Sequence, residues 1–106
     1  MVKVKIIWTE SAVFELKNIY EYYKGKVSII VAGKIKERIF SSVKQLKNYL
    51  LSGAIEENLI DTKYEYRYLV EGNYKVIYRY EDKTVYIIDI FDCRRNPLEM
   101  KYTPNP

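Results

Sequence analysis

The order of alternating and helical patterns in this 106-residue chain predicts an α+β fold in a single domain spanning residues 1–106. One alternating segment opens the chain, two segments of helical periodicity follow, and three further alternating segments come after them. Short connections predict that the helices form an antiparallel hairpin and the last strands an antiparallel meander. The N-terminal strand and the three-stranded meander should form one small sheet, with the helices packed on one face. Residues 97–106 are expected to form a flexible tail.

The first strand and the first helix are predicted from the N-terminal quarter of the chain. Apolar residues alternate with lysines over residues 2–8, so this strand should bury one face. Thr9 and Ser11 offer N-cap side chains for the helix that follows. Apolar residues then recur every three or four positions, and Gly25 is expected to end the helix because glycine is favoured just after a last helical turn.

A second, longer helix is predicted to begin after Ser28, whose side chain can cap it, and to stop at Ser52 and Gly53. Its apolar residues form one stripe that should face the core. An acidic loop over residues 54–62 then leads into the meander. Three strands are predicted, the last of which is the most apolar and therefore expected at the centre of the sheet. They cover residues 63–70, 74–80 and 85–91, with a Gly-Asn turn after the first.

Composition excludes several kinds of chemistry. The chain has no histidine and one cysteine, so no metal site and no internal disulfide are expected, and no other cofactor is predicted. Cys93 is interpreted as a packing residue, since no histidine can activate its thiol. No apolar run is long enough to cross a membrane and the N-terminus lacks a signal-peptide pattern, so a cytoplasmic protein without a membrane partner is predicted.

Positive charge is concentrated on the predicted helical hairpin. Residues 24–47 carry seven lysines and arginines against one acid, which indicates an anionic partner, either a nucleic acid or an acidic polypeptide. The alternative is a solvated helix face. Two phenylalanines fall outside the apolar stripes, and we predict that they and neighbouring lysines form a partner-binding surface; isolated exposed side chains are the alternative. These residues are Phe14, Lys36, Phe40 and Lys44.

A second group of cations lies on the meander. Arg67, Lys75 and Arg79 can share the sheet face opposite the helices if the Gly-Asn hairpin has its usual register, and that face should be free. Arg94 and Arg95 come just after the last strand. Clustered cations stabilise phosphate charge or bind the carboxylates of a protein partner. The alternative is that they form surface ion pairs with nearby acids of this chain.

The residues that carry the most specific signal lie in segment 67–97. There a Gly-Asn hairpin is followed by an apolar strand that ends in Arg-Arg-Asn-Pro at residues 94–97. With residues 8–12, Trp-Thr-Glu-Ser-Ala, and the two helices, this arrangement resembles the RelE/ParE superfamily of bacterial toxins from type II toxin–antitoxin pairs. The resemblance covers nearly the whole chain. It implies growth inhibition, an antitoxin as cognate partner, and a small antiparallel sheet packed on a helical hairpin.

The resemblance leaves two activities open. One branch cleaves mRNA on the ribosome, and Lys75 and Arg95 match two of its basic catalytic positions, with Tyr102 one residue out of register for its tyrosine. Glu56 and Glu57 fall where that branch places lysines, which counts against RNA cleavage.

The other branch, ParE-like, binds and poisons DNA gyrase without a catalytic centre, and the ending of residues 94–97 favours it. The preferred interpretation is therefore a protein inhibitor rather than an enzyme. In it, Arg67, Arg79 and Arg94 form a functional basic cluster. A non-toxic basic binding module is a third hypothesis.

Overall fold

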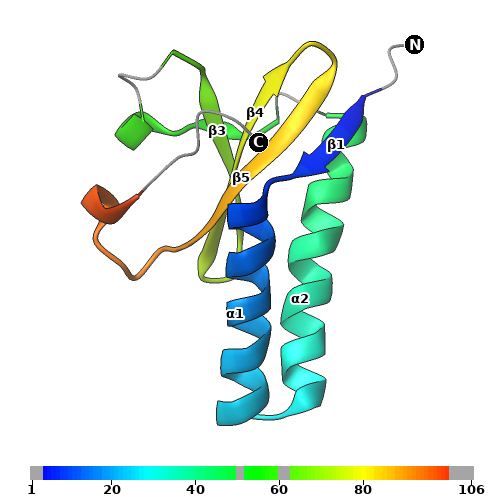
Figure 1. Ribbon diagram of the computed structural model, residues 1–106, viewed down its shortest axis with the longest axis vertical. Helices are drawn as coiled ribbons and strands as arrows, with labels where there is room; N and C mark the ends of the chain where they lie inside the picture. The colour runs from blue at the N-terminus through cyan, green and yellow to red at the C-terminus, as the bar shows by residue number, and fades with distance from the viewer. Residues whose placement is uncertain (1–3, 50–51, 60–62, 101–106) are drawn as a thin grey trace.

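The computed structural model, which describes residues 4–49, 52–59 and 63–100, has two antiparallel helices packed on one face of a mixed sheet (Figure 1). The predicted fold class is therefore confirmed. The five strands lie in the order β1-β5-β4-β3-β2, with β1 parallel to β5 and every other pair antiparallel. They are β1 Lys5–Trp8, β2 Ala54–Ile55, β3 Tyr66–Glu71, β4 Tyr74–Glu81 and β5 Thr84–Asp92.

Two details of the sheet differ from the prediction. The centre of the sheet is β4, whereas β5, expected there, lies between β1 and β4. Two neighbouring strands still flank β5, which explains its apolar sequence. The strand β2 was predicted as loop, since two residues are too short to show a period. It pairs with the middle of β3 and extends the sheet on that side.

The helix α1, Glu10–Lys26, begins where predicted. The Thr9 side chain accepts a hydrogen bond from the Ala12 N–H (3.2 Å), and its hydroxyl donates to the Ile87 carbonyl (2.8 Å), which ties the helix start to β5. The helix continues through Gly25, where we expected it to end. Its last turn closes instead through the Val27 N–H, which donates to the Tyr23 carbonyl at 2.9 Å.

The helix α2, Ile29–Lys44, is capped by Ser28 as predicted and continues into a 3₁₀ turn, η1, Gln45–Lys47. It therefore ends before Gly53, which has a different role. A Cβ at Gly53 would lie 2.7 Å from both the Tyr68 carbonyl oxygen and the Tyr78 hydroxyl, so glycine is required for close packing rather than for the helix stop.

The main core lies between the helices and the sheet, and it is almost wholly apolar. Ala12 from α1 and three residues of α2 and η1 pack against β4 and β5. Partly buried residues of β1, including Trp8, extend this core toward the edge of the sheet. The fully buried members from the second helix and the sheet include Ile39, Val43, Leu46, Val76, Tyr78, Ile87 and Ile90.

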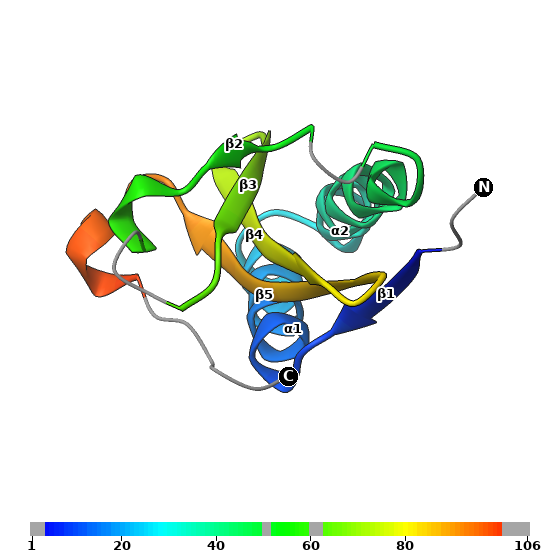
Figure 2. The ribbon, with the colours of Figure 1, turned by 90° about the horizontal axis from the view of Figure 1, so that it is seen from above.

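The opposite face of the sheet, predicted to be free, is covered. Two short 3₁₀ turns, η2 Glu57–Leu59 and η3 Pro97–Glu99, lie close together and away from the helices (Figure 2). Leu59 and Met100 pack there on Tyr66, Ile77, Ile88 and Phe91 in a second, smaller core. Of the predicted tail, residues 97–99 form η3 and Met100 packs in this core, and residues 101–106 lie outside the described part. In that part of the chain no helix is long and apolar enough to span a membrane.

Candidate functional site

Lys75, a predicted catalytic residue, forms an ion pair within the covered face. Its Nζ lies 2.9 Å from Oε2 of Glu56 and 4.2 Å from the centroid of the Tyr68 ring. Glu56 is only 2% exposed, and its other oxygen accepts a hydrogen bond of 2.8 Å from the Asn58 side-chain amide. Burial raises the pKa of this carboxyl, but the hydrogen bonds from Lys75 and Asn58 outweigh burial and lower the pKa below its usual 4.5.

Arg79 is also enclosed rather than presented to solvent. The residue is 2% exposed and its guanidinium lies between the rings of Tyr64 and Tyr86, 4.1 and 4.4 Å from their centroids. It also pairs with Glu81 at the outer end of β4. The aromatic faces and one carboxylate replace water around this cation. Arg79 is therefore part of the second core.

Arg67 lies on the other face, so the prediction that it shares one face with Lys75 and Arg79 is wrong. In the β3–β4 register Arg67 is opposite Tyr78, and Tyr78 belongs to the core beneath the helices. Paired residues of an antiparallel ladder point to the same side, which places Arg67 there too. Its Nη1 donates to the Gly53 carbonyl at 2.8 Å, and its Nε is 3.0 Å from Glu65 Oε2.

Arg95 and Lys75 both neighbour Phe91. Lys75 is the cross-strand neighbour of Phe91, and the Arg95 guanidinium lies 5.1 Å from the centre of its ring. Arg95 is half exposed and makes one long contact of 3.5 Å with Glu99. The carboxylate of Glu56 beside Lys75 offsets the charge that an RNA phosphate would need. Tyr102, the third predicted catalytic residue, lies outside the described residues.

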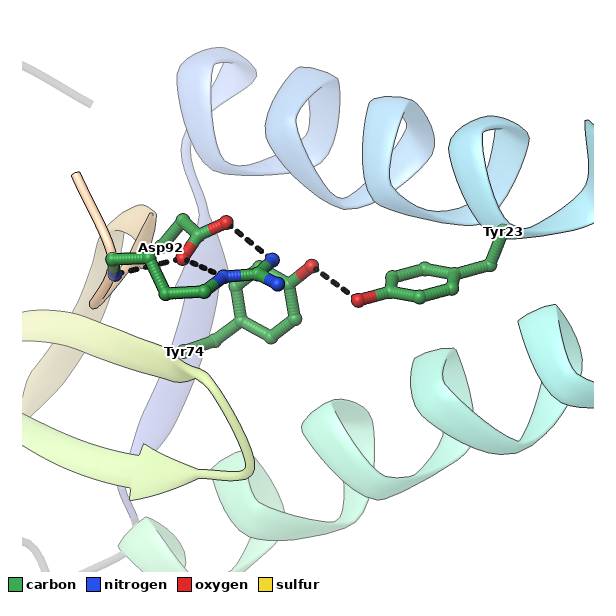
Figure 3. Close-up of polar contacts among 4 residues, drawn as sticks. Tyr23, Tyr74 and Asp92 are labelled. Carbon is green, nitrogen blue, oxygen red and sulfur yellow. Dashed lines mark hydrogen bonds and ion pairs between the residues drawn. The ribbon is translucent and has the colours of Figure 1, made fainter. Parts of the chain in front are cut away.

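Arg94 pairs with Asp92 just after β5, beside a tyrosine contact that joins β4 to α1 (Figure 3). Its guanidinium is bidentate on Asp92, with hydrogen bonds of 2.9 and 2.7 Å, and its backbone N–H also donates to that carboxylate. These bonds from Arg94 lower the pKa of Asp92. Next to this pair the hydroxyl of Tyr74 donates to that of Tyr23 on α1 at 3.4 Å. Burial, followed by this bond, raises the pKa of Tyr74.

The same network borders a groove of about 390 Å³ between α1 and the ends of β4 and β5. Two cations and two acids line it, Arg94 and Arg95 against Asp92 and Glu15, so its charges nearly balance. Near it, burial and repulsion from Glu15 raise the pKa of Asp89 to about 6. The two carboxylates would repel a polyanion, so the paired charges of this groove do not favour binding of RNA there.

Phe40, one of the predicted partner-binding residues, is exposed on α2 and lies next to half-buried rings and to lysines. The Phe40 ring makes an edge contact with Trp8 (5.6 Å between centroids), and Lys44 Nζ lies 5.8 Å from the centre of Phe40. Lys36, one turn before Phe40, lies over the Tyr20 ring at 5.4 Å. We call these residues, Trp8, Tyr20, Lys36, Phe40 and Lys44, the hairpin flank.

Phe14 does not belong to the hairpin flank. It is six positions before Tyr20 on α1, so the two side chains point about 120° apart around the helix. Its ring is 60% exposed, which keeps it available for a partner on another side of the hairpin. The structure therefore brings three of the four predicted partner-binding residues together and leaves Phe14 apart.

Sequence reasoning missed the most deeply buried charge, Glu56, and the aromatic residue Trp8 in the hairpin flank. The sequence did contain a signal for the segment that covers the sheet face opposite the helices. Ile77 and Phe91 alternate onto the face that was assigned to solvent, and large apolar residues there indicate a covering segment. No local pattern marked Glu56 itself, because its partner Lys75 is 19 positions away in the chain.

A helical hairpin packed on one face of a mixed sheet is the architecture that the resemblance to the RelE/ParE superfamily implied. A solved structure with this fold is the "Chromosomal ParDE TA system from P. aeruginosa", with a TM-score of 0.73 and 22% identity over 87% of this chain and 98% of that one. The family model described as "ParE toxin of type II toxin-antitoxin system, parDE" matches residues 6–97. The chain therefore belongs to the ParE toxin family. Among curated protein sequences, none matches it.

Proposed function

We propose that this chain inhibits bacterial growth by binding and poisoning DNA gyrase, and that a cognate antitoxin neutralises it. Membership of the ParE family supports a toxin with an antitoxin partner. The observation that carries the choice of target is the internal pairing of the cations on the sheet. Lys75 is bound by Glu56, and Arg79 is enclosed by Tyr64, Tyr86 and Glu81. Neither is a free cation that could receive a scissile phosphate.

The antitoxin is proposed to bind the hairpin flank, which combines exposed aromatic area with two cations. Phe40 is 43% exposed and lies between Trp8 and Lys44. Such a surface suits an amphipathic acidic segment, whose apolar side chains cover the rings while its carboxylates pair with Lys36 and Lys44. Phe14, on a different side of α1, would be reached only by a segment that wraps around the hairpin.

The target is tested by pulse-labelling of DNA and protein synthesis in a bacterial host just after the chain alone is induced. We expect DNA synthesis to fall first, with trapped DNA breaks, because a poisoned gyrase stops replication. Purified gyrase should lose supercoiling activity when the chain is added. If neither synthesis falls, the chain is a non-toxic binding module and the proposal is wrong.

Ribosome-dependent mRNA cleavage is the second candidate, and the shared position of Lys75 and Arg95 beside Phe91 is the observation in its favour. It predicts an early fall in protein synthesis. Arg95→Ala should then abolish cleavage while the chain stays folded, and Tyr102→Phe should weaken it. Lys75→Met should also abolish cleavage, and it is combined with Glu56→Gln so that no buried carboxylate is left without its partner. If protein synthesis falls first in the wild type but Arg95→Ala cleaves mRNA normally, this site assignment fails.

A further inference from the structure

The turn between α1 and α2 carries aliphatic side chains that contact little within the chain. Val27, Ile29 and Ile30 are 60, 58 and 68% exposed, although they follow one another almost directly in sequence. Figure 1 shows the turn between α1 and α2 extending past the sheet, so this exposed segment projects from the molecule. Single exposed aliphatic residues are ordinary, but three together at a projection mark a contact surface.

Cations surround this aliphatic group. Lys24 and Lys26 lie in the last turn of α1, and Lys34 lies one turn after Ile30 on α2. None of the three has an acidic partner within the ion-pair distance among the described residues. An occupant must therefore be apolar at its centre and negative around it.

Two glycines beside the aliphatic group are an independent observation. Gly25 and Gly33 both lie inside helices, where glycine destabilises a helix relative to alanine. A Cβ added at either position would meet nothing within 4 Å, so packing within the chain does not require glycine. Gly33 follows Ile29 and Ile30 by one turn and lies on their side of α2. The bare backbone there lets a partner surface come close to the helix.

We infer that this surface inserts into an apolar pocket with an acidic rim on the toxin's target protein. We call it the hairpin tip, formed by Val27, Ile29, Ile30 and Gly33 with Lys24, Lys26 and Lys34. The inference rests on the proposed function, in which the target is DNA gyrase. The tip adjoins the hairpin flank, because Gly33 and Lys36 are one turn apart on α2, and it extends from there to the turn between the helices. Ile30 and Phe40 are ten residues apart, or about 15 Å along the helix axis.

A folded protein fits this surface better than an anionic membrane does. Three lysines and three short aliphatic side chains give weak attachment to a bilayer, where even a whole fatty-acyl chain binds only marginally. A preformed pocket gains more binding free energy from the same residues, because it encloses them on several sides and its carboxylates can pair with the lysines directly.

The test compares the wild-type chain with two tip variants in a gyrase supercoiling assay and in growth inhibition after induction. Ile29→Ser/Ile30→Ser removes the inserted side chains, and Gly33→Gln fills the bare helix surface. Each should raise the concentration for half-inhibition about tenfold or more, as loss of a central interface contact does. The Gly33→Gln variant should unfold at or above the wild-type temperature, because it replaces a helix glycine.

Val70→Ser is the matched control, as Val70 is 63% exposed on β3 and lies outside the tip. It should inhibit gyrase within about twofold of the wild type. If the wild type inhibits gyrase and both tip variants do so equally well, the tip inference is wrong and the proposed function stands. If the wild type slows growth without affecting gyrase, the gyrase proposal fails, and equal toxicity of the tip variants then overturns the tip as well.

Two further outcomes would also overturn the inference. Binding of the wild type, but not of the tip variants, to vesicles of phosphatidylcholine and phosphatidylserine would identify a membrane as the occupant. A wild-type chain that neither slows growth nor inhibits gyrase would remove both the proposed function and the inference built on it.

Discussion

The two faces of the sheet are both buried, but by different means. On one face, α1 and α2 lay long apolar stripes over β4 and β5, and the core beneath is almost wholly apolar. On the other face, η2, η3 and a group of tyrosines cover a smaller core. That second core accommodates two cations, Lys75 and Arg79, each held by aromatic rings and one carboxylate. Stability on the first face thus comes from apolar burial, and on the second partly from charge.

The difference bears on function. A cation at an outward position of a strand is usually interpreted as part of a binding surface, yet here the chain's own rings and acids surround both cations. Exposed apolar residues instead include Phe40 at the hairpin flank and Val27, Ile29 and Ile30 at the hairpin tip. In this protein the sheet supports the fold, and we propose that the hairpin meets the partners.

The largest expected effect comes from a truncation in the apolar face. Ile87 on β5 is fully buried, and Ile87→Ala should lower the free energy of unfolding by about 2–5 kcal/mol through lost burial and the cavity left behind. Urea unfolding followed by circular dichroism measures this loss. Val70→Ala, at an exposed position, should change it by less than about 0.5 kcal/mol. Equal effects of the two substitutions would contradict the assignment of the main core.

A smaller effect is expected from removing the charge of Arg79 while keeping its bulk. Arg79→Met should lower the free energy of unfolding by about 2 kcal/mol, because it removes the contacts of the guanidinium with two aromatic rings and with Glu81. Methionine fills much of the same space, so loss of packing contributes less. The same urea unfolding assay gives the number. An unchanged or higher stability would show that the second core needs only apolar bulk, like the first.

The comparison also explains how much could be predicted from sequence. The helix-covered face followed from periodicity, because apolar residues recur with a helical or strand period wherever one side of an element is buried. The caps at Thr9 and Ser28 followed from side-chain chemistry alone. The cover of the second face could not be predicted in either way. This cover consists of 3₁₀ turns too short to show a period, and the ion pair of Lys75 with Glu56 joins residues 19 positions apart, which leaves no local signal.

The candidate site was predicted only in part for the same reason. Lys36, Phe40 and Lys44 share one helix, so their common side followed from helical spacing. Arg67 and Lys75 lie on different strands, and their relative placement depends on register. The two-residue turn places Arg67 opposite Tyr78, and that pairing separates it from the other two cations. The length of the turn alone is enough to predict the β3–β4 register, and with it the separation of Arg67 from Lys75 and Arg79.

The smallest expected effect separates the two faces by pH. The free Glu56 carboxyl titrates near 4.5, and Lys75 and Asn58 hold its pKa lower in the folded chain. Its ion pair therefore stabilises the fold fully above pH 4.5 and loses that contribution as pH falls through the lowered pKa. Glu56→Gln should lower the free energy of unfolding by about 1 kcal/mol at pH 7, because the amide keeps its hydrogen bond with Asn58 but loses the ion pair with Lys75.

The stability difference between the wild type and Glu56→Gln should accordingly shrink as the pH is lowered below the usual carboxyl value, and chemical unfolding at a series of pH values follows it. Glu57→Gln, at the exposed neighbouring position, is the control and should track the wild type. Ile87→Ala should show a loss that does not change with pH, because no titrating group is removed from the apolar face. If the wild type remained more stable than Glu56→Gln by the same amount at low pH, packing rather than charge would hold Lys75 in place.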